Sequence, residues 1–508
     1  MKKTIILALS IGIILFFTLY TNQLWEDFFI TAKYSINFAE GKGLTYYPGD
    51  KVQGFTSPFN TLLLSFIYFV TCKSFSLTLI IFRIISILAY LFSVCFLLDI
   101  IGKSKKNFAY ISLIPVMIYI LESKVVAFSM NGMETGFSLF FYSGMIWILS
   151  KGFMKRLIPL AFFWAGMIWC RPDNALYILV ACVGLLLFKD KEENYKNIII
   201  SLFKASIIGS IFYLPWLIGS WIYYGSPIPQ TFFAKSFLSF DLTTLVYKIS
   251  QIYQLIASFF LPPYSQIGGF DDFKILTFLS ALPCILFWLY PKAGKVARIC
   301  SFSAFVATIY LLFMPFTFPW YLPIIEFMCL VTLSDILYYL LKNNEKIFKL
   351  SLVFFISVII SLLFLFRDYT KLAEAQFNIN DKNRISIGLW LKENADEGDD
   401  VLLECVGFIG FYSKLRVIDY PGIITPESVE IRKKFGDNLA FIAFHLKPKW
   451  IVLRPFEASH FTNLKPGWLD NHYELAKVFD VREDMRKAVP HHAQALWDSL
   501  FYVYKKKQ

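Results

Sequence analysis

Residues 77–101 read LTLIIFRIISILAYLFSVCFLLDII, and only Arg83 and Asp99 in this run carry a charge. About 20 consecutive apolar residues are enough to cross the hydrocarbon core of a bilayer as a helix. The rest of the chain has the same character, since 57% of its 508 residues are hydrophobic and only 17% are charged. A soluble fold of this size could not remove so much apolar surface from water. The sequence therefore predicts an integral membrane protein.

Further apolar runs predict an all-α, polytopic membrane domain of about 11 transmembrane helices. The predicted spans are residues 4–20, 77–101, 108–122, 134–150, 157–170, 174–188, 198–222, 273–290, 299–315, 321–341 and 347–366. The first run is expected to be retained as a span, because no small-residue cleavage site typical of a signal peptide follows it.

Every second connection between these runs carries lysine and arginine. The basic clusters lie at residues 2–3, 103–106, 151–156, 189–196, 292–298 and 342–346. Basic connections are typical of the cytoplasmic side, so the N-terminus is predicted inside and the tail from residue 367 outside. This orientation requires the apolar run 58–71 to be a helix lying at the outer interface. A short additional pair of spans is the competing interpretation.

The predicted domains are a transmembrane domain, residues 1–366, whose first outer loop is 21–76, and an extracytoplasmic domain, residues 367–508. The expected location is the plasma (inner) membrane. In the outer loop, apolar and polar residues of 27–40 interleave as in a short amphipathic helix on a membrane surface.

The tail reads as a small α/β domain. It has a predicted helix at 385–394 and predicted short strands at 401–404, 416–419 and 450–453. From Arg367 onward the chain has 21 Lys+Arg against 20 Asp+Glu, so no basic stripe coincides with the soluble part. Nucleic acid is therefore not an expected partner.

Two adjacent carboxylates, Glu26 and Asp27, directly follow the first predicted span. One interpretation is that they mark where the span ends in water. The other is that a carboxylate just outside the bilayer takes a proton from an acceptor hydroxyl. Adjacent helical residues point about 100° apart, so both are not expected to reach one substrate atom. We expect Asp27 to be the catalytic base and Glu26 to support it.

A set of motifs, in order along the chain, resembles those of bacterial arabinofuranosyltransferase-like enzymes of the GT-C superfamily of polytopic glycosyltransferases. The motifs are residues 26–34 (EDFFITAKY), 38–44 (FAEGKGL), 47–58 (YPGDKVQGFTSP), 131–136 (NGMETG), 171–173 (RPD), 224–235 (YGSPIPQTFFAK) and 410–419 (GFYSKLRVID).

The resemblance implies a polyprenyl-phosphate-sugar donor and an acidic catalytic base in the first outer loop. It also implies inverting single displacement onto a cell-envelope glycan or glycolipid on the outer face, with the tail domain roofing the cavity. The family commonly has two Asp where this chain has Glu26-Asp27, and Arg where it has Lys33 and Ile36. It commonly has Arg-Tyr where this chain has Trp320-Tyr321. These departures leave the sugar and the acceptor open.

The turn at Arg171-Pro172-Asp173 is a candidate donor site. The apolar runs on either side hold only about 13–15 residues and reach about 20–22 Å, less than the roughly 30 Å core. The turn is therefore expected at the floor of an outer cavity, where an Arg and an Asp need partners. Either Arg171 and Asp173 form a structural pair, or Arg171 binds the donor phosphate.

Other candidates carry weaker signals. Lys235 either neutralises the same phosphate or is merely solvated. Glu134 is either a helix-start carboxylate or a substrate ligand. Tyr321 fits an interfacial belt as well as a sugar platform. Within the matched motifs, Lys33, Asp173 and Gln230 are also expected to bind substrate.

The sequence has no GxxxxGK[ST] loop and no GxGxxG helix start, so no nucleotide phosphate site is visible. It also has no HExxH pair and no paired Cys/His ligands that would indicate zinc. Glu26 and Asp27 alone are too few ligands to hold a divalent cation, so no metal or cofactor is expected. The expected partners are the lipid-linked donor, the acceptor and membrane lipids.

Two other classes of protein compete with the enzyme interpretation. A polytopic transporter or lipid flippase of envelope biogenesis predicts repeats with broken helices, and a scaffold for envelope assembly predicts a tail that binds other proteins.

Overall fold

The computed structural model describes residues 2–103, 113–235, 246–247, 249–260, 274–314, 317–341, 365–488 and 496–507. The chain forms two compact units. Unit 1 comprises Met1–Tyr20, Phe82–Leu217 and Ser239–Tyr369, and unit 2 comprises Thr21–Ile81, Ile218–Leu238 and Thr370–Gln508. The predicted outer loop and the predicted tail therefore belong to the same compact unit. The domain boundary at residue 366 stays a prediction.

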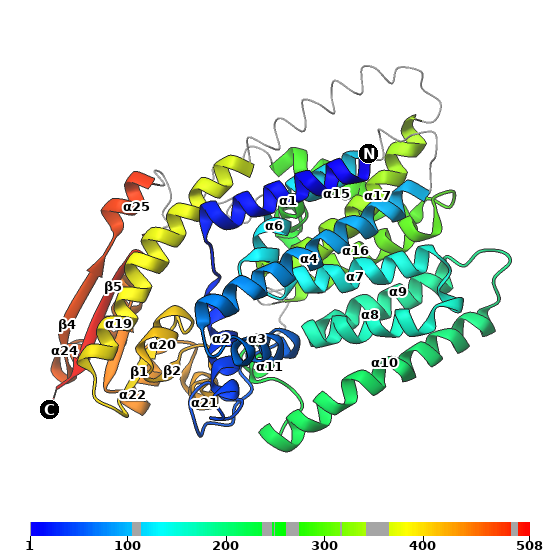
Figure 1. Ribbon diagram of the computed structural model, residues 1–508. Coiled ribbons are helices and arrows are strands. Elements are labelled where there is room, and N and C mark those ends of the chain that lie inside the picture. Colours follow the sequence, from blue (N-terminus) through cyan, green and yellow to red (C-terminus); the bar gives the residue numbers. More distant parts are fainter. Residues whose placement is uncertain are drawn as a thin grey trace. The chain divides into compact units, whose positions relative to one another are not determined.

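Unit 1 is built from apolar helices (Figure 1). Its longer helices are α1 (Lys2–Thr21), α4 (Phe75–Lys103), α5 (Leu113–Leu121), α6 (Ser123–Met130), α7 (Thr135–Ser150), α8 (Leu157–Cys170), α9 (Ala175–Leu187), α10 (Tyr195–Tyr224), α15 (Lys274–Leu286), α16 (Lys295–Phe313) and α17 (Leu322–Leu341). Helices α4 and α10 extend into unit 2. Short helices accompany them at η1 (Phe153–Lys155), η2 (Pro172–Asn174), α13 (Ile252–Ala257), η3 (Ser258–Phe260), η5 (Phe287–Leu289) and η6 (Pro319–Tyr321).

Each span predicted before residue 342 corresponds to a helix, and the span predicted at 347–366 lies mostly outside the described residues. Within the described ranges, five helices are long and apolar enough to cross a membrane, and the bent pair Leu113–Leu121 and Ser123–Met130 would make six. Other apolar helices are shorter: α8 has 14 residues and a length of about 21 Å. The chain is thus a multi-pass membrane protein, while the number of about 11 spans stays a prediction.

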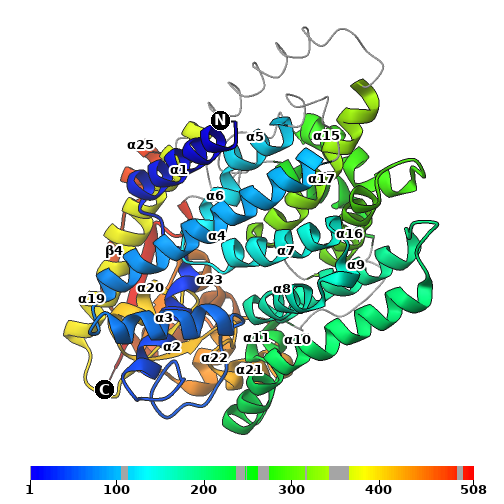
Figure 2. The same ribbon diagram turned by 45° about the vertical axis from the view of Figure 1, so that its right-hand side comes forward.

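Helices α7 and α8 lie side by side in both views (Figure 1, Figure 2) and interlock through a reciprocal pair of glycines. A Cβ at Gly144 of α7 would overlap the ring of Phe163 on α8, and a Cβ at Gly166 of α8 would overlap the ring of Phe141 on α7. Each phenylalanine therefore occupies the space that the opposite glycine leaves. Small residues at helix contacts let the backbones approach closely in this way.

Replacing Gly144 with Ala is expected to lower the free energy of unfolding by about 1–3 kcal/mol, because the added methyl group must displace the Phe163 ring. Stability can be measured by denaturation of the purified protein in detergent. Gly12→Ala on α1 is the matched control, since nothing lies within 4 Å of the position of its Cβ. Equal stability of the two variants would contradict the interlock.

In unit 2 the tail folds around a five-stranded sheet of order β2-β1-β3-β5-β4. The strands are β1 (Asp400–Leu403), β2 (Arg416–Asp419), β3 (Trp450–Leu453), β4 (Tyr473–Asp480) and β5 (Leu500–Lys506). Strands β2, β1 and β3 are parallel, and β5 and β4 continue the sheet antiparallel. The helices of the tail are the π-helical segment η7 (Gln376–Arg384), α19 (Ile385–Asn394), α20 (Phe408–Ser413), α21 (Pro426–Phe435), α22 (Leu439–Leu446), α23 (Pro455–Leu464), α24 (Trp468–His472) and α25 (Arg482–Ala488).

The core of the tail lies between the sheet and helices α22 and α23, where Leu402, Ile451 and Leu453 meet Ile442 and Phe461. The predicted α/β fold, the helix at 385–394 and the first three strands are confirmed, while β4 and β5 were not predicted.

The outer loop forms α2 (Glu26–Ala39) and α3 (Pro58–Val70), and α11 (Gln230–Lys235) comes from the later connection. The predicted amphipathic helix in the first outer loop is therefore present as α2. Ser57 caps α3 by accepting a hydrogen bond from the N–H of Asn60 (3.3 Å), and Pro58 occupies the first turn. Helix α3 packs on α2, where the Ser35 hydroxyl donates to the carbonyl of Thr61 (2.8 Å). That α3 lies at the outer membrane interface stays a prediction.

Candidate functional site

The acidic pair opens helix α2. Glu26 and Asp27 are its first two residues and both lie in its first turn. The preceding Trp25 makes no side-chain cap hydrogen bond, and the dipole at the N-terminal end of the helix favours negative charge there. Both side chains are half-buried. Because successive helical residues point about 100° apart, the two carboxylates face different surroundings.

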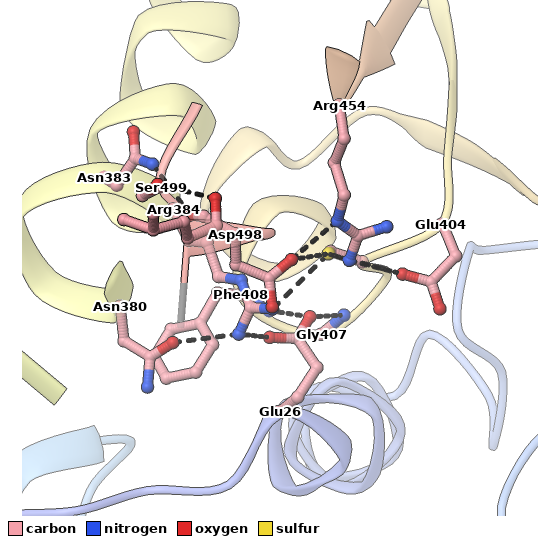
Figure 3. Close-up of polar contacts among 12 residues, drawn as sticks. Glu26, Asn380, Asn383, Arg384, Glu404, Gly407, Phe408, Arg454, Asp498 and Ser499 are labelled. Carbon is pink, nitrogen blue, oxygen red and sulfur yellow. Dashed lines mark hydrogen bonds and ion pairs between the residues drawn. The ribbon is translucent and has the colours of Figure 1, made fainter. Parts of the chain in front are cut away.

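Glu26 is held by the tail (Figure 3). Its Oε1 accepts hydrogen bonds from the N–H groups of Gly407 (2.7 Å) and Phe408 (3.2 Å), and its Oε2 pairs with Nη1 of Arg384 (2.9 Å). Burial raises the pKa of Glu26, and the guanidinium of Arg384 opposes that rise. Both carboxylate oxygens are thus engaged by other parts of unit 2. Because Glu26 is engaged in this way, Asp27 stays the candidate base, and Glu26 is expected to support it.

Arg384 belongs to a buried network of charges that continues into the tail (Figure 3). Asp498 pairs with Nη2 of Arg384 (3.0 Å) and with Nε of Arg454 (2.6 Å), and these two guanidinium groups hold the pKa of Asp498 below its usual value despite its burial. Arg454 also pairs with Glu404 (2.8 Å) and Glu457 (2.9 Å). Sequence reasoning missed this network. Its one local signal is Glu457, which accepts from the N–H of Arg454 (2.7 Å) as a capping residue does three positions into a helix.

Lys33 lies on the side of α2 that meets α20. Its Nζ donates to the carbonyl of Gly410 (3.1 Å) and lies 5.4 Å from the centre of the Tyr46 ring. Burial lowers the pKa of Lys33 to about 8, and the positive charges of Lys414 and Lys42 add to the effect. The structure gives Lys33 a contact with the tail, and its predicted role in substrate binding stays a prediction.

The lowered pKa of Lys33 predicts a pH dependence of stability. Below about pH 8 the ammonium is charged in both states, and its burial destabilises the fold. Between about pH 8 and 10 the folded state releases this proton before the unfolded state does, so the free energy of unfolding rises with pH. We expect the wild-type melting temperature to rise relative to that of Lys33→Met across this interval. A difference between the two proteins that does not change with pH would contradict the prediction.

Two further candidates lie at the ends of α11. Gln230, its first residue, donates its N–H to the carbonyl of Gln53 (2.9 Å) and its side-chain amide to the carbonyl of Gly422 (3.1 Å). Gln230 therefore joins the outer loop to the tail. Lys235 is the last residue of α11 and is half-buried. The predicted contacts of Lys235 with phosphate and of Gln230 with substrate stay predictions.

Arg171 is the centre of a second cluster, in unit 1. Its Nε and Nη2 donate to the two carboxylate oxygens of Asp173 (2.9 Å each), and its Nη1 donates to Glu134 (2.7 Å). Nη2 also donates to the hydroxyl of Tyr321 (2.9 Å). The structure thus brings together four of the candidate residues, which come from three separate places in the sequence. The pairing of Arg171 with Asp173 is present, as the structural interpretation expected.

The charge balance of this cluster bears on the phosphate prediction. One guanidinium faces the carboxylates of Glu134 and Asp173, so the three groups together carry no positive excess. Phosphate binding by Arg171 would require it to exchange a carboxylate partner for the ligand. Over the described ranges, no group of three or more His, Cys, Asp or Glu is arranged to hold a metal ion.

Comparison with known proteins places this architecture among solved structures. Residues 370–502 match a family described as a domain of unknown function (DUF8728). No curated protein matches the chain. The chain is similar to ArnT from Cupriavidus metallidurans bound to undecaprenyl phosphate, with a TM-score of 0.57 and 11% identity over 98% of this chain and 97% of that one.

It is also similar to the oligosaccharyltransferase of Archaeoglobus fulgidus tethered with an acceptor peptide. The TM-score is 0.57, with 12% identity over 95% of this chain and 73% of that one. The mycobacterial arabinofuranosyltransferase AftD aligns with a TM-score of 0.49 over 40% of its own chain, at 12% identity. At such identities the first two similarities establish a shared fold: apolar helices followed by a small C-terminal sheet.

Proposed function

We propose that this chain, which has the fold of the GT-C membrane glycosyltransferases, transfers a sugar from a polyprenyl-phosphate donor to a cell-envelope glycan or glycolipid. The observation that supports this most is the similarity in fold to ArnT, which covers nearly the whole of both chains. The related structure contains undecaprenyl phosphate, a lipid carrier of the expected class. No similarity in fold of this extent supports the alternative, a transporter or lipid flippase.

The proposed reaction is a single displacement. The acceptor hydroxyl attacks C1 of the sugar, a bond from C1 to the acceptor oxygen forms, and the bond from C1 to the phosphate oxygen breaks. The proton of the hydroxyl goes to the carboxylate of Asp27, and the electron pair of the broken bond stays on the lipid phosphate. One such step inverts the anomeric centre. The position of Asp27 in the first turn of α2 suits this task, because the helix dipole at this end favours its ionised form.

The remaining candidates receive separate tasks in the proposal. Arg171 and Lys235 are assigned to the donor phosphate, where fixed positive charge would stabilise the leaving group. Before the donor binds, Glu134, Asp173 and Tyr321 hold the Arg171 guanidinium, and one of the two carboxylates gives way to the phosphate. Lys33 on α2 and Gln230 on α11 are proposed to contact the substrate. The active side is proposed to be the outer face of the plasma membrane, with the tail extracytoplasmic.

A deletion strain tests the proposal. We expect loss of one sugar from a surface glycan or glycolipid and accumulation of one lipid-linked sugar, both visible by mass spectrometry of the two fractions. The purified protein should then consume the accumulated lipid-linked sugar and form a new glycosidic bond. Unchanged glycans, together with movement of the lipid across vesicles without a glycosidic product, would overturn the proposal in favour of a flippase.

A further inference from the structure

The tail and the base-bearing helix α2 are joined by an unusually close contact around Glu26. Gly407 lies directly against the first turn of α2, and a Cβ at position 407 would overlap the carbonyl oxygen of Glu26. The same glycine donates its N–H to the Glu26 carboxylate (2.7 Å). Both the backbone and the side chain of Glu26 are therefore fixed by one position of the tail.

A second contact lies just before the helix. The N–H of Leu24 donates to Oε1 of Gln376 (3.1 Å), the first residue of the π-helical segment η7. Arg384, the last residue of the same segment, pairs with Glu26. Segment η7 thus holds the chain on both sides of Trp25, at the two positions that lead into Asp27. Wide helical turns of this kind occur often at functional sites.

The contacts of α2 with the tail follow one face of the helix. Phe29 packs against the rings of Phe408 (centres 4.3 Å apart) and Phe411 (5.0 Å), and Lys33 donates to Gly410. Together with Glu26 these residues occupy positions i, i+3 and i+7, which lie on the same side of an α-helix. Contact along this stripe fixes the rotation of α2 about its own axis. Because Asp27 follows Glu26 by one residue, its direction is fixed about 100° away from the tail contact.

Arg384 itself is held rigidly. Its Nη1 donates to Asn380 (2.9 Å), and its Nη2 pairs with Asp498, which in turn pairs with Arg454. A buried guanidinium with several fixed partners has little freedom to follow a moving carboxylate. Movement of Glu26 would separate its carboxylate from the Arg384 guanidinium and from the N–H groups of Gly407 and Phe408, so the clamp resists displacement of α2.

We propose that the tail domain, whose family is described only as being of unknown function, positions the catalytic base: Arg384 and Gly407 clamp Glu26 and thereby set the direction of Asp27. This rests on the proposed function, in which Asp27 is the base. Glu26, Arg384 and Gly407 are positioning residues, since they act on Asp27 through the placement of α2. Loss of the clamp is therefore expected to lower the turnover rate and to leave donor binding nearly unchanged.

The test compares Arg384→Gln with wild type as full-length protein in lipid nanodiscs. The probe is the lipid-linked sugar that accumulates in a strain lacking the protein. We expect turnover at saturating donor to fall about 10- to 100-fold, since small misplacement of a reacting group has effects of this size, while KM for the donor changes less than about twofold. Arg384→Lys should recover part of the rate. Amide hydrogen exchange should show lost protection in α2 beyond its first turn, where the N–H groups bond within the helix, and retained protection in β1, β2 and β3.

Arg482→Gln is the matched control, because Arg482 pairs with Asp480 on the exposed surface of the same tail (2.7 Å) and should alter neither readout. Wild-type turnover in Arg384→Gln, or unchanged protection of α2, would overturn the clamp while leaving the transferase assignment intact. If Arg384→Gln does not fold, turnover and hydrogen exchange are measured instead on Gly407→Ala and Arg384→Lys, and the same outcomes support or overturn the clamp. A wild-type protein with a protected α2 but no transfer activity would instead overturn the proposed function.

Discussion

Replacing Asp27 with Asn is expected to lower the rate of sugar transfer by about 10²- to 10⁴-fold, the usual contribution of a positioned general base. The amide keeps the size of the side chain but cannot take the proton of the acceptor hydroxyl. Since the phosphate ligands are assigned to other residues, KM for the donor should change little. The measurement is turnover of the lipid-linked sugar by purified protein.

Glu40→Gln is the matched control for this experiment. Glu40 carries a carboxylate just past the other end of α2, where it pairs with Lys42 (2.6 Å), so its replacement removes the same charge from the same element. We expect this variant to retain wild-type turnover. Asp27→Glu should keep measurable activity, because the carboxylate is present but moved by one methylene. Full activity of a correctly inserted Asp27→Asn protein would remove Asp27 from the role of base.

Hydropathy and short-range spacing predicted much of the fold. Apolar runs placed the helices of unit 1, and short apolar segments bounded by Gly and Pro placed β1, β2 and β3. Strand β4 lacks that signal for a physical reason. In β4 every residue after Tyr473 is exposed or only partly buried, as on an edge strand. Strand β5 lies inside the sheet and begins with five apolar or aromatic residues, LFYVY, so its sequence did carry a strand signal that the prediction missed.

In the candidate site, too, contacts between residues near in sequence could be predicted, and contacts between distant residues could not. Arg171 and Asp173 are only two positions apart, so the sequence could predict their pairing. The carboxylate of Glu26 and the N–H of Gly407 that binds it are 381 positions apart. No local pattern connects them, because only the fold brings the two positions together. The grouping of the outer loop with the tail in one compact unit could likewise come only from the structure.

The largest effect on stability is expected in unit 1, at a buried lysine that pairs with a buried glutamate. Lys124 on α6 is 1% exposed and Glu326 on α17 is fully buried, with 2.6 Å between Nζ and Oε1. Nζ also donates to the carbonyls of Ser258 (2.7 Å) and Phe259 (2.9 Å), and Glu122 lies 3.7 Å away. Two N–H groups of the ammonium thus bond to carbonyls, and its charge is matched by the carboxylate of Glu326. Ionisable groups among apolar helices persist when they are matched in this way.

Lys124→Met should lower the free energy of unfolding by about 3–5 kcal/mol, because it leaves the Glu326 carboxylate buried without its counter-charge. The double variant Lys124→Met/Glu326→Met should regain most of that loss, since two apolar side chains of similar volume replace the whole ion pair. Reversible denaturation in detergent micelles measures both. A single variant as stable as wild type would show that the ion pair is not formed. A double variant as unstable as the single one would show that the loss comes from packing or from the freed carbonyls of Ser258 and Phe259, and not from an unpaired charge.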